Sequence, residues 1–166
     1  MNLEDRTKIA DAMTSGKYTQ VKGMLRSSKS ENCFCAVGLS IAILEPSILW
    51  VRDLNYEEWG LTDGEEIYYG DIVNDTPLDF SWLNDREESF LMHLNDNFNY
   101  SFYDISLMLR QSDATWQQEC KKLNDLTNGV YAIMVASDVD SHPKIVDYNA
   151  GLESRMKHHK DTYEQV

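Results

Sequence analysis

Two cysteines open an apolar stretch near residue 33, and their position is the feature of this sequence most suggestive of chemistry. Asn32 is a favoured helix N-cap, and residues 33–44, CFCAVGLSIAIL, are apolar on nearly every side of a helix. The pattern predicts a buried helix that starts at Cys33 and ends before Pro46. A thiol in the first turn of a helix faces the positive end of the helix dipole, which favours the nucleophilic thiolate.

A cysteine hydrolase or transferase needs two further groups, a histidine to accept the thiol proton and a carboxylate or amide to orient the imidazole. His142 follows Cys33 in a compatible order, and Asp147 or Asn149 comes after it. The alternative is that the cysteines are small apolar residues of a core helix. The glutamine before the cysteine and the tryptophan after it, which are usual in such hydrolases, are absent. We therefore expect structural thiols, with Cys33, His142 and Asp147 as the alternative catalytic set.

Metal and cofactor sites are not indicated by the remaining motifs. The C-x-C pair supplies two of the four ligands that structural zinc needs, and no second pair follows. The stretch SDVDSH begins like a calcium loop but lacks the glycine and distal glutamate of an EF-hand. His93 and Asp96 have the spacing of an acid–base pair, although a helix end and a turn cap explain them equally well. We expect no cofactor and no metal.

Negative charge is concentrated in the middle of the chain. The net charge is −13, and residues 53–88 hold twelve acidic residues and one basic residue, Arg86. Such a segment repels nucleic acid and anionic membranes and attracts basic protein surfaces. The simpler alternative is a solvated acidic face that keeps the protein in solution.

A binding surface on this segment would combine acids with aromatic residues. The expected contact residues are Glu57, Glu58, Asp63, Glu65, Glu66, Asp71, Trp59 and Tyr68. Closely spaced acids can imitate the charge of a DNA duplex, which presents one charge per about 1.7 Å of its axis. The expected partner is therefore a protein with a basic surface, without direct binding to nucleic acid or membrane.

The hydrophobic pattern predicts an α+β fold with about five helices around a buried central helix and a small antiparallel sheet. Helices are expected over 3–14, 33–44, 84–94, the stretch after the Ser101–Asp104 capping signal, 113–126, and the tail from 151. Residues 55–61 suggest a short amphipathic helical turn. Asn128–Gly129 predicts a turn, and VYAIMVA and KIVDY predict a late hairpin. The length fits a single domain over 1–166.

Three segments, in this order, resemble a family of small uncharacterised proteins of tailed bacteriophages and prophages. They are SGKYTQVKGMLR (15–26), FCAVGLS (34–40) and LNDNFNYSFYDISLML (94–109). The family-like core would span about 1–111, and the helix, hairpin and final helix over about 112–166 would be additions. Family members often carry two adjacent cysteines, whereas Ala36 follows Cys35 here. The resemblance implies a phage origin and action in the bacterial cytoplasm, and it supplies no activity.

The function expected from these observations is that of a non-enzymatic accessory protein. It would bind a host or anti-phage defence protein through its acidic segment. The N-terminal sequence MNLEDRTKIADAM lacks the basic and apolar regions of a signal peptide, and the three cysteines are too few for a disulfide framework. Both observations favour a cytoplasmic location.

Overall fold

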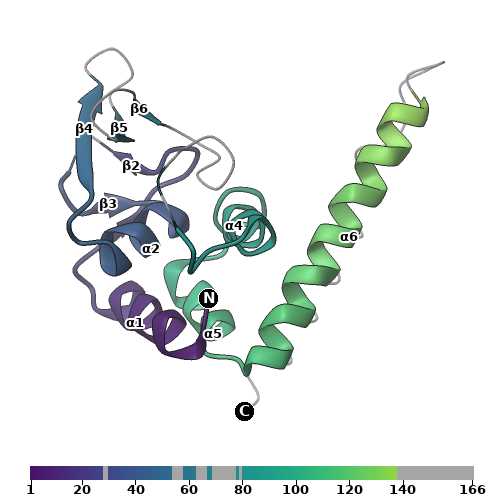
Figure 1. The fold of residues 1–166 in the computed structure, drawn as a ribbon, viewed down its shortest axis with the longest axis horizontal. Coiled ribbons are helices and arrows are strands. Elements are labelled where there is room, and N and C mark those ends of the chain that lie inside the picture. The colour runs from purple at the N-terminus through teal and green to yellow at the C-terminus, as the bar shows by residue number, and fades with distance from the viewer. Residues whose placement is uncertain (28–29, 54–57, 63–66, 69–77, 79, 138–166) are drawn as a thin grey trace. The chain divides into compact units, whose positions relative to one another are not determined.

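The computed structural model describes residues 1–27, 30–53, 58–62, 67–68, 78 and 80–137. Their contacts divide the chain into two compact units, Met1–Lys121 and Lys122–Val166. Among its described residues, the first unit contains a small sheet, four α-helices and the start of a fifth, and Figure 1 shows their order along the chain. Within the described ranges, no helix combines the length and apolar character needed to cross a membrane.

The first helix, α1 (Leu3–Thr14), begins and ends where the sequence predicts. Asn2 is its N-cap, and its side chain accepts a hydrogen bond from the amide of Asp5 at 2.9 Å. Gly16 follows the helix with a φ of +73°, a left-handed conformation that glycine adopts without steric cost. The inner side of α1 packs against α2 and α5.

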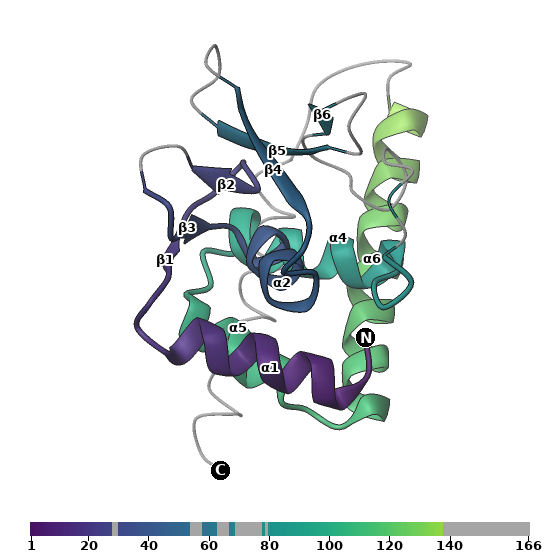
Figure 2. The ribbon, with the colours of Figure 1, turned by 60° about the vertical axis from the view of Figure 1, so that its left-hand side comes forward.

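The sheet is built from short strands that come from distant parts of the sequence. Its order is β1 (Thr19–Gln20), β3 (Cys33–Phe34), β2 (Arg26–Ser27), β5 (Glu58–Thr62) and β4 (Leu49–Asp53), and β6 (Ile67–Tyr68) also pairs with β5. Strands β1 and β3 are parallel, and the other pairs are antiparallel. Figure 2 shows the sheet above α2, with α1 and α5 below.

The central apolar segment is a strand followed by a helix, so the prediction of a continuous helix from Cys33 is wrong. Cys33 and Phe34 form β3, and α2 runs over Ala36–Leu44 with Cys35 as its N-cap. The reason is tertiary: β3 pairs with Thr19–Gln20 on one side and with Arg26 on the other. The predicted end of the helix before Pro46 is confirmed.

The stretch around Trp59 is also a strand, which corrects the helical turn expected over 55–61. In β5, residues 58–62 pair without interruption with the five residues of β4. The β4 strand was not anticipated, because LWVRD begins only three residues after Pro46 and shows no clear alternation of apolar and polar residues.

The next elements follow the predictions more closely. Helix α4 (Asp85–Met92) is capped by Asn84, and a π-helical turn, η1 (His93–Asn97), continues it. Helix α5 (Phe102–Leu109) begins with the predicted capping box, in which Ser101 and Asp104 bond reciprocally. Helix α5 packs along α1, as Figures 1 and 2 both show.

The last described element is α6, over Asp113–Ser137. Asn128 and Gly129 lie inside it, so the predicted turn there is wrong, and 130–136 is helical instead of the first strand of a hairpin. The second hairpin strand and the tail helix lie outside the described residues. The α+β class itself is confirmed: five α-helices and a small, mostly antiparallel sheet occur among the described residues.

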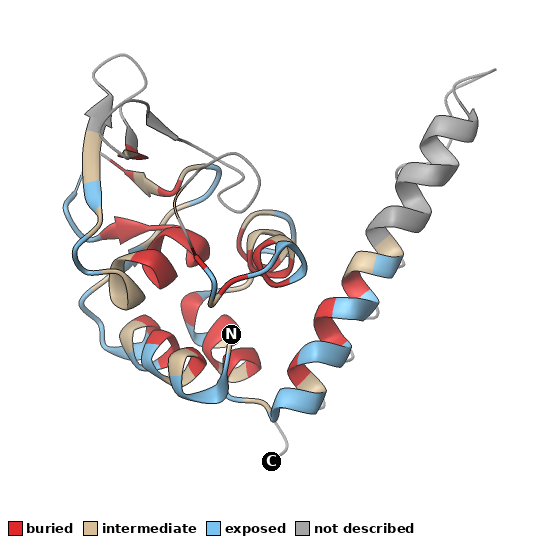
Figure 3. Cartoon of the chain, viewed as in Figure 1, coloured by how far each residue is buried: buried red, intermediate tan, exposed pale blue. Residues whose placement is uncertain are grey.

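The core of the first unit is centred on α2. The six residues Ala36–Ile41 are all buried, as the red stretch of α2 in Figure 3 shows. Around them lie apolar side chains from α1, α4 and α5, which include Ile9, Leu91 and Ile105. The expectation of a buried central helix is therefore confirmed for 36–41.

Candidate functional site

The three segments that carry the family resemblance meet at one buried side chain, Asn95. Its amide oxygen accepts hydrogen bonds from Gln20 Nε2 at 2.8 Å and from the Ala36 amide at 3.2 Å. Its amide nitrogen donates to the Val21 carbonyl at 2.8 Å and to Asp96 Oδ1 at 2.5 Å. Asn95 is fully buried, and its oxygen accepts twice and its nitrogen donates twice. We call Gln20, Cys35, Asn95 and Asp96 the motif junction.

Asp96 extends the junction toward the turn after β1. Its Oδ1 accepts a hydrogen bond from the Gly23 amide at 3.1 Å, and Gly23 has a φ of +67°. Gln20 Nε2 also donates to the carbonyl of Tyr100 at 2.8 Å. These bonds tie β1, the following turn, η1 and the start of α5 to the N-terminus of α2. The junction therefore holds together segments about 60 to 80 residues apart in sequence.

Cys35 occupies the helix N-terminus that the sequence assigned to Cys33. Its Sγ accepts a hydrogen bond from the Gly38 amide at 3.3 Å, and its own amide donates to the Leu25 carbonyl at 3.1 Å. Burial raises the pKa of the Cys35 thiol to about 12, and the negative charge of Asp96 adds to this effect. The desolvation outweighs the favourable N-terminal position, so the thiol stays protonated near neutral pH.

Cys33 lies in β3, opposite Thr19 in the register, and is about 9% exposed. It is not in the first turn of a helix, so the helix-dipole argument for its reactivity does not apply. Cys120 is buried in α6, and burial, with repulsion from Glu87, raises its pKa to about 12. His142 and Asp147, the other members of the alternative catalytic set, lie outside the described residues.

His93 and Asp96 have separate partners. His93 Nδ1 lies 2.9 Å from the Ser89 carbonyl, one turn earlier, while Asp96 contacts Gly23 and Asn95. Both side chains thus make structural contacts between the π-helical turn and the segments next to it. Within the described part of the chain, no three His, Cys, Asp or Glu side chains gather closely enough to hold a metal ion.

A second buried polar network surrounds the carboxylate of Glu87, which is fully buried. The amino group of Met1 and Asn84 Nδ2 donate to Oε2 at 2.6 and 2.9 Å. Trp116 Nε1 and Gln117 Nε2 donate to Oε1 at 2.8 and 3.0 Å. Four donors compensate the carboxylate for its lost hydration and fasten the first turns of α6 to α4.

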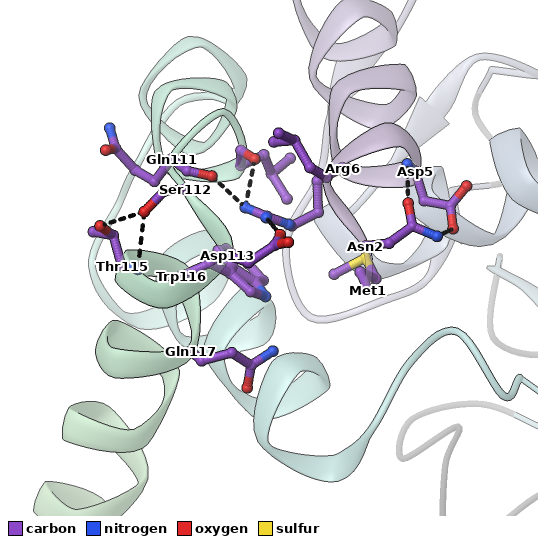
Figure 4. A network of polar contacts seen from close by, with 12 residues as sticks. Met1, Asn2, Asp5, Arg6, Gln111, Ser112, Asp113, Thr115, Trp116 and Gln117 are labelled. Carbon is purple, nitrogen blue, oxygen red and sulfur yellow. Dashed lines mark hydrogen bonds and ion pairs between the residues drawn. The ribbon is translucent and has the colours of Figure 1, made fainter.

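Arg6 is fully buried, and Figure 4 shows its side chain directed toward Gln111 and Asp113. Its Nη1 donates to the carbonyls of Leu109 and Gln111 at 3.0 and 2.8 Å, and its Nη2 pairs with Asp113. The guanidinium also lies 5.2 Å from the ring centroid of Trp116. Arg6 thereby closes the C-terminal end of α5 and anchors the start of α6, which is a structural role.

The acidic segment is only partly described. Five of the eight expected contact residues lie outside the described residues: Glu57, Asp63, Glu65, Glu66 and Asp71. The structure places the backbone of the other three, Glu58 and Trp59 in β5 and Tyr68 in β6. Two acids of the segment, Glu87 and Glu88, are buried, so they are excluded from the candidate binding surface. Ten of its twelve acids remain as candidates.

Sequence reasoning missed the residues that organise the structure. Gln20 and Asn95 lie inside the motifs of the family resemblance, and the order of those motifs was the signal available for them. Arg6 and Glu87 look like ordinary charged residues of amphipathic helices, and no local pattern marks them as buried. Comparisons with protein-family models, with curated proteins and with solved structures found no match to this chain.

Proposed function

We propose that this protein acts by binding a partner protein with a basic surface, through the acidic segment 53–88, and that it has no catalytic role of its own. The observation that carries the proposal is the concentration of charge: ten acids of the segment remain as surface candidates against the single base Arg86, which is exposed. Complementary charge accelerates association and excludes partners of the same sign.

The state of the thiols supports a binding role over the cysteine-hydrolase alternative. Cys33 is buried in a strand, and the pKa values of Cys35 and Cys120 are raised to about 12 by burial. A nucleophilic cysteine needs an accessible thiolate near neutral pH. The motif junction likewise consists of hydrogen-bonded groups centred on the buried Asn95, as expected of a scaffold that holds a surface in place.

The family resemblance extends this proposal to a setting. A tailed phage or prophage origin would place the protein in the bacterial cytoplasm, with a host or anti-phage defence protein as its partner. An acidic surface of this kind would occupy a basic groove that otherwise holds DNA. The DNA-mimicking role rests on charge density and on the resemblance.

The proposal is tested by affinity capture from bacterial lysate with the wild-type protein and a variant in which Glu57, Glu58, Glu65 and Glu66 are all glutamine. We expect the wild type to retain a basic protein at 0.1 M salt and to lose it at 1 M. At 1 M the Debye length is roughly 3 Å, so attraction between exposed charges is largely screened. The variant should retain little of it at either salt concentration. Equal capture by both proteins would refute a charge-based contact.

A further inference from the structure

One edge of β4 has no pairing strand among the described residues of the first unit. Among the described residues, β4 is the terminal strand of the sheet order and pairs with β5 alone. Figures 1 and 2 show no described element alongside its other edge. The register with β5 runs through all five residues without a bulge. The strand LWVRD also contains neither proline nor lysine, the residues that commonly protect strand edges.

The side chains at the start of β4 are unusually exposed for apolar residues. Leu49 is 64% exposed, the largest exposure of any large hydrophobic residue in the described part of the chain. Trp50 is half-buried, packs edge-on against Phe34 and lies 5.5 Å from the guanidinium of Arg26. A free strand edge with exposed leucine beside tryptophan has the features of a strand-addition surface.

We propose that β4 pairs antiparallel with β4 of a second copy of this chain, about a two-fold axis at Val51, to form a continuous sheet across a homodimer. The argument is the complementarity of the strand with itself. Pairing centred on Val51 places Val51 opposite Val51, Trp50 opposite Arg52, and Leu49 opposite Asp53. No like charges lie directly opposite each other, although the two Arg52 residues are diagonal neighbours, and the exposed Leu49 gains Val51 of the other copy as a diagonal neighbour.

The neighbouring registers are less favourable. Centring the pair on Arg52 places two arginines directly opposite each other, which is destabilising. Centring it on Trp50 leaves both Arg52 and Asp53 beyond the paired residues. A single register therefore uses the whole strand, and register specificity is what separates a defined interface from non-specific edge association. This proposal is independent of the proposed function, because it concerns the β4 edge and a second copy.

Disulfide trapping tests the register directly. Directly opposed residues in an antiparallel pair have Cα atoms about 4.5–5.5 Å apart, within the range of a disulfide. Val51→Cys should therefore form a covalent dimer on mild oxidation. In Leu49→Cys the two thiols would lie four residues apart along the strands, about 13 Å, and should not cross-link. The native cysteines are buried, so the wild type provides the background.

Sedimentation equilibrium of the unmodified chain supplies the second measurement. We expect a mass that rises from monomer to dimer with concentration. Two copies that each carry −13 repel, so dimerisation should strengthen as salt rises from 0.05 to 0.5 M. Val51→Lys should remain monomeric, whereas Tyr103→Lys, at an exposed position on α5, should dimerise like the wild type. A monomeric wild type at all concentrations, or equal cross-linking of the Leu49→Cys and Val51→Cys variants, would overturn the proposal.

Discussion

Replacing Gly38 by alanine should destabilise the protein, although the same change normally stabilises a helix. Gly38 lies inside α2, where alanine is favoured over glycine by about 1 kcal/mol. An ideal Cβ at this position would lie 1.9 Å from the Leu25 carbonyl oxygen and 2.7 Å from its carbon. Real Cβ contacts essentially never fall below 3.0 Å, so α2 and the backbone at Leu25 must separate by about 1.1 Å, the difference between 3.0 and 1.9 Å.

The magnitude follows from three contributions. Overpacking against a rigid neighbour costs about 1–3 kcal/mol, and here the neighbour is backbone that cannot rotate away. The separation also breaks the hydrogen bond from the Cys35 amide to the Leu25 carbonyl, now 3.1 Å, at a cost of about 1 kcal/mol. The gain in helix propensity offsets about 1 kcal/mol. The net loss is about 1–3 kcal/mol in the free energy of unfolding.

Thermal and urea unfolding followed by circular dichroism would measure this loss. For a chain of this size we expect a decrease in Tm of roughly 3–10 °C. Ala42→Gly is the matched control in the same helix, since it should lose only about 1 kcal/mol of helix propensity. A Gly38→Ala variant as stable as the wild type, or more stable, would refute the close approach of α2 to Leu25.

Four further predictions concern the buried groups. Cys35 and Cys120 should react slowly with an alkylating reagent at pH 8 in the folded protein, and rapidly once the chain is unfolded; fast labelling of folded protein would contradict their burial. Because folding raises both pKa values from about 9 to about 12, the folded state holds these protons more tightly, so stability should be constant below pH 9 and fall as pH rises toward 12 in a urea-unfolding series. Asn95→Ala should cost about 2–4 kcal/mol by urea unfolding, because it leaves buried donors and acceptors unpaired, and a loss under 1 kcal/mol would contradict the motif junction. Leu39→Ala should cost about 2–5 kcal/mol as a truncation of a fully buried side chain, and a loss below 1 kcal/mol would show that α2 is not central to the core.

The sequence predicted those helix boundaries that are set by nearby residues. The Asn2 cap, the Ser101–Asp104 capping box and the stop before Pro46 are each decided by residues within one turn of the boundary. Asn32 was a stronger local cap than Cys35, yet the helix begins after Cys35. Pairing of Cys33–Phe34 with two distant strands outweighs the local preference, and a single sequence does not reveal such pairing.

The site was less predictable than the fold, because its contacts are long-range. Asn95 bonds to residues about 60 to 75 positions away, and Glu87 bonds to Trp116 across 29 positions. A buried carboxylate and an exposed one look alike in an amphipathic pattern, which is why Glu87 and Glu88 were counted in the acidic segment. The Asn128–Gly129 dipeptide shows the opposite error. It usually forms a turn and was predicted to do so, but α6 continues through it.

The rate of association with the captured partner, measured over a salt series, tests the central claim most directly. If the acidic segment is the contact surface, the wild-type association rate constant should fall at least tenfold between 0.05 and 0.5 M salt, while the dissociation rate changes little. The variant with glutamine at 57, 58, 65 and 66 should associate slowly at low salt and show a much flatter dependence. An association rate that is insensitive to salt and identical for the two proteins would contradict the account.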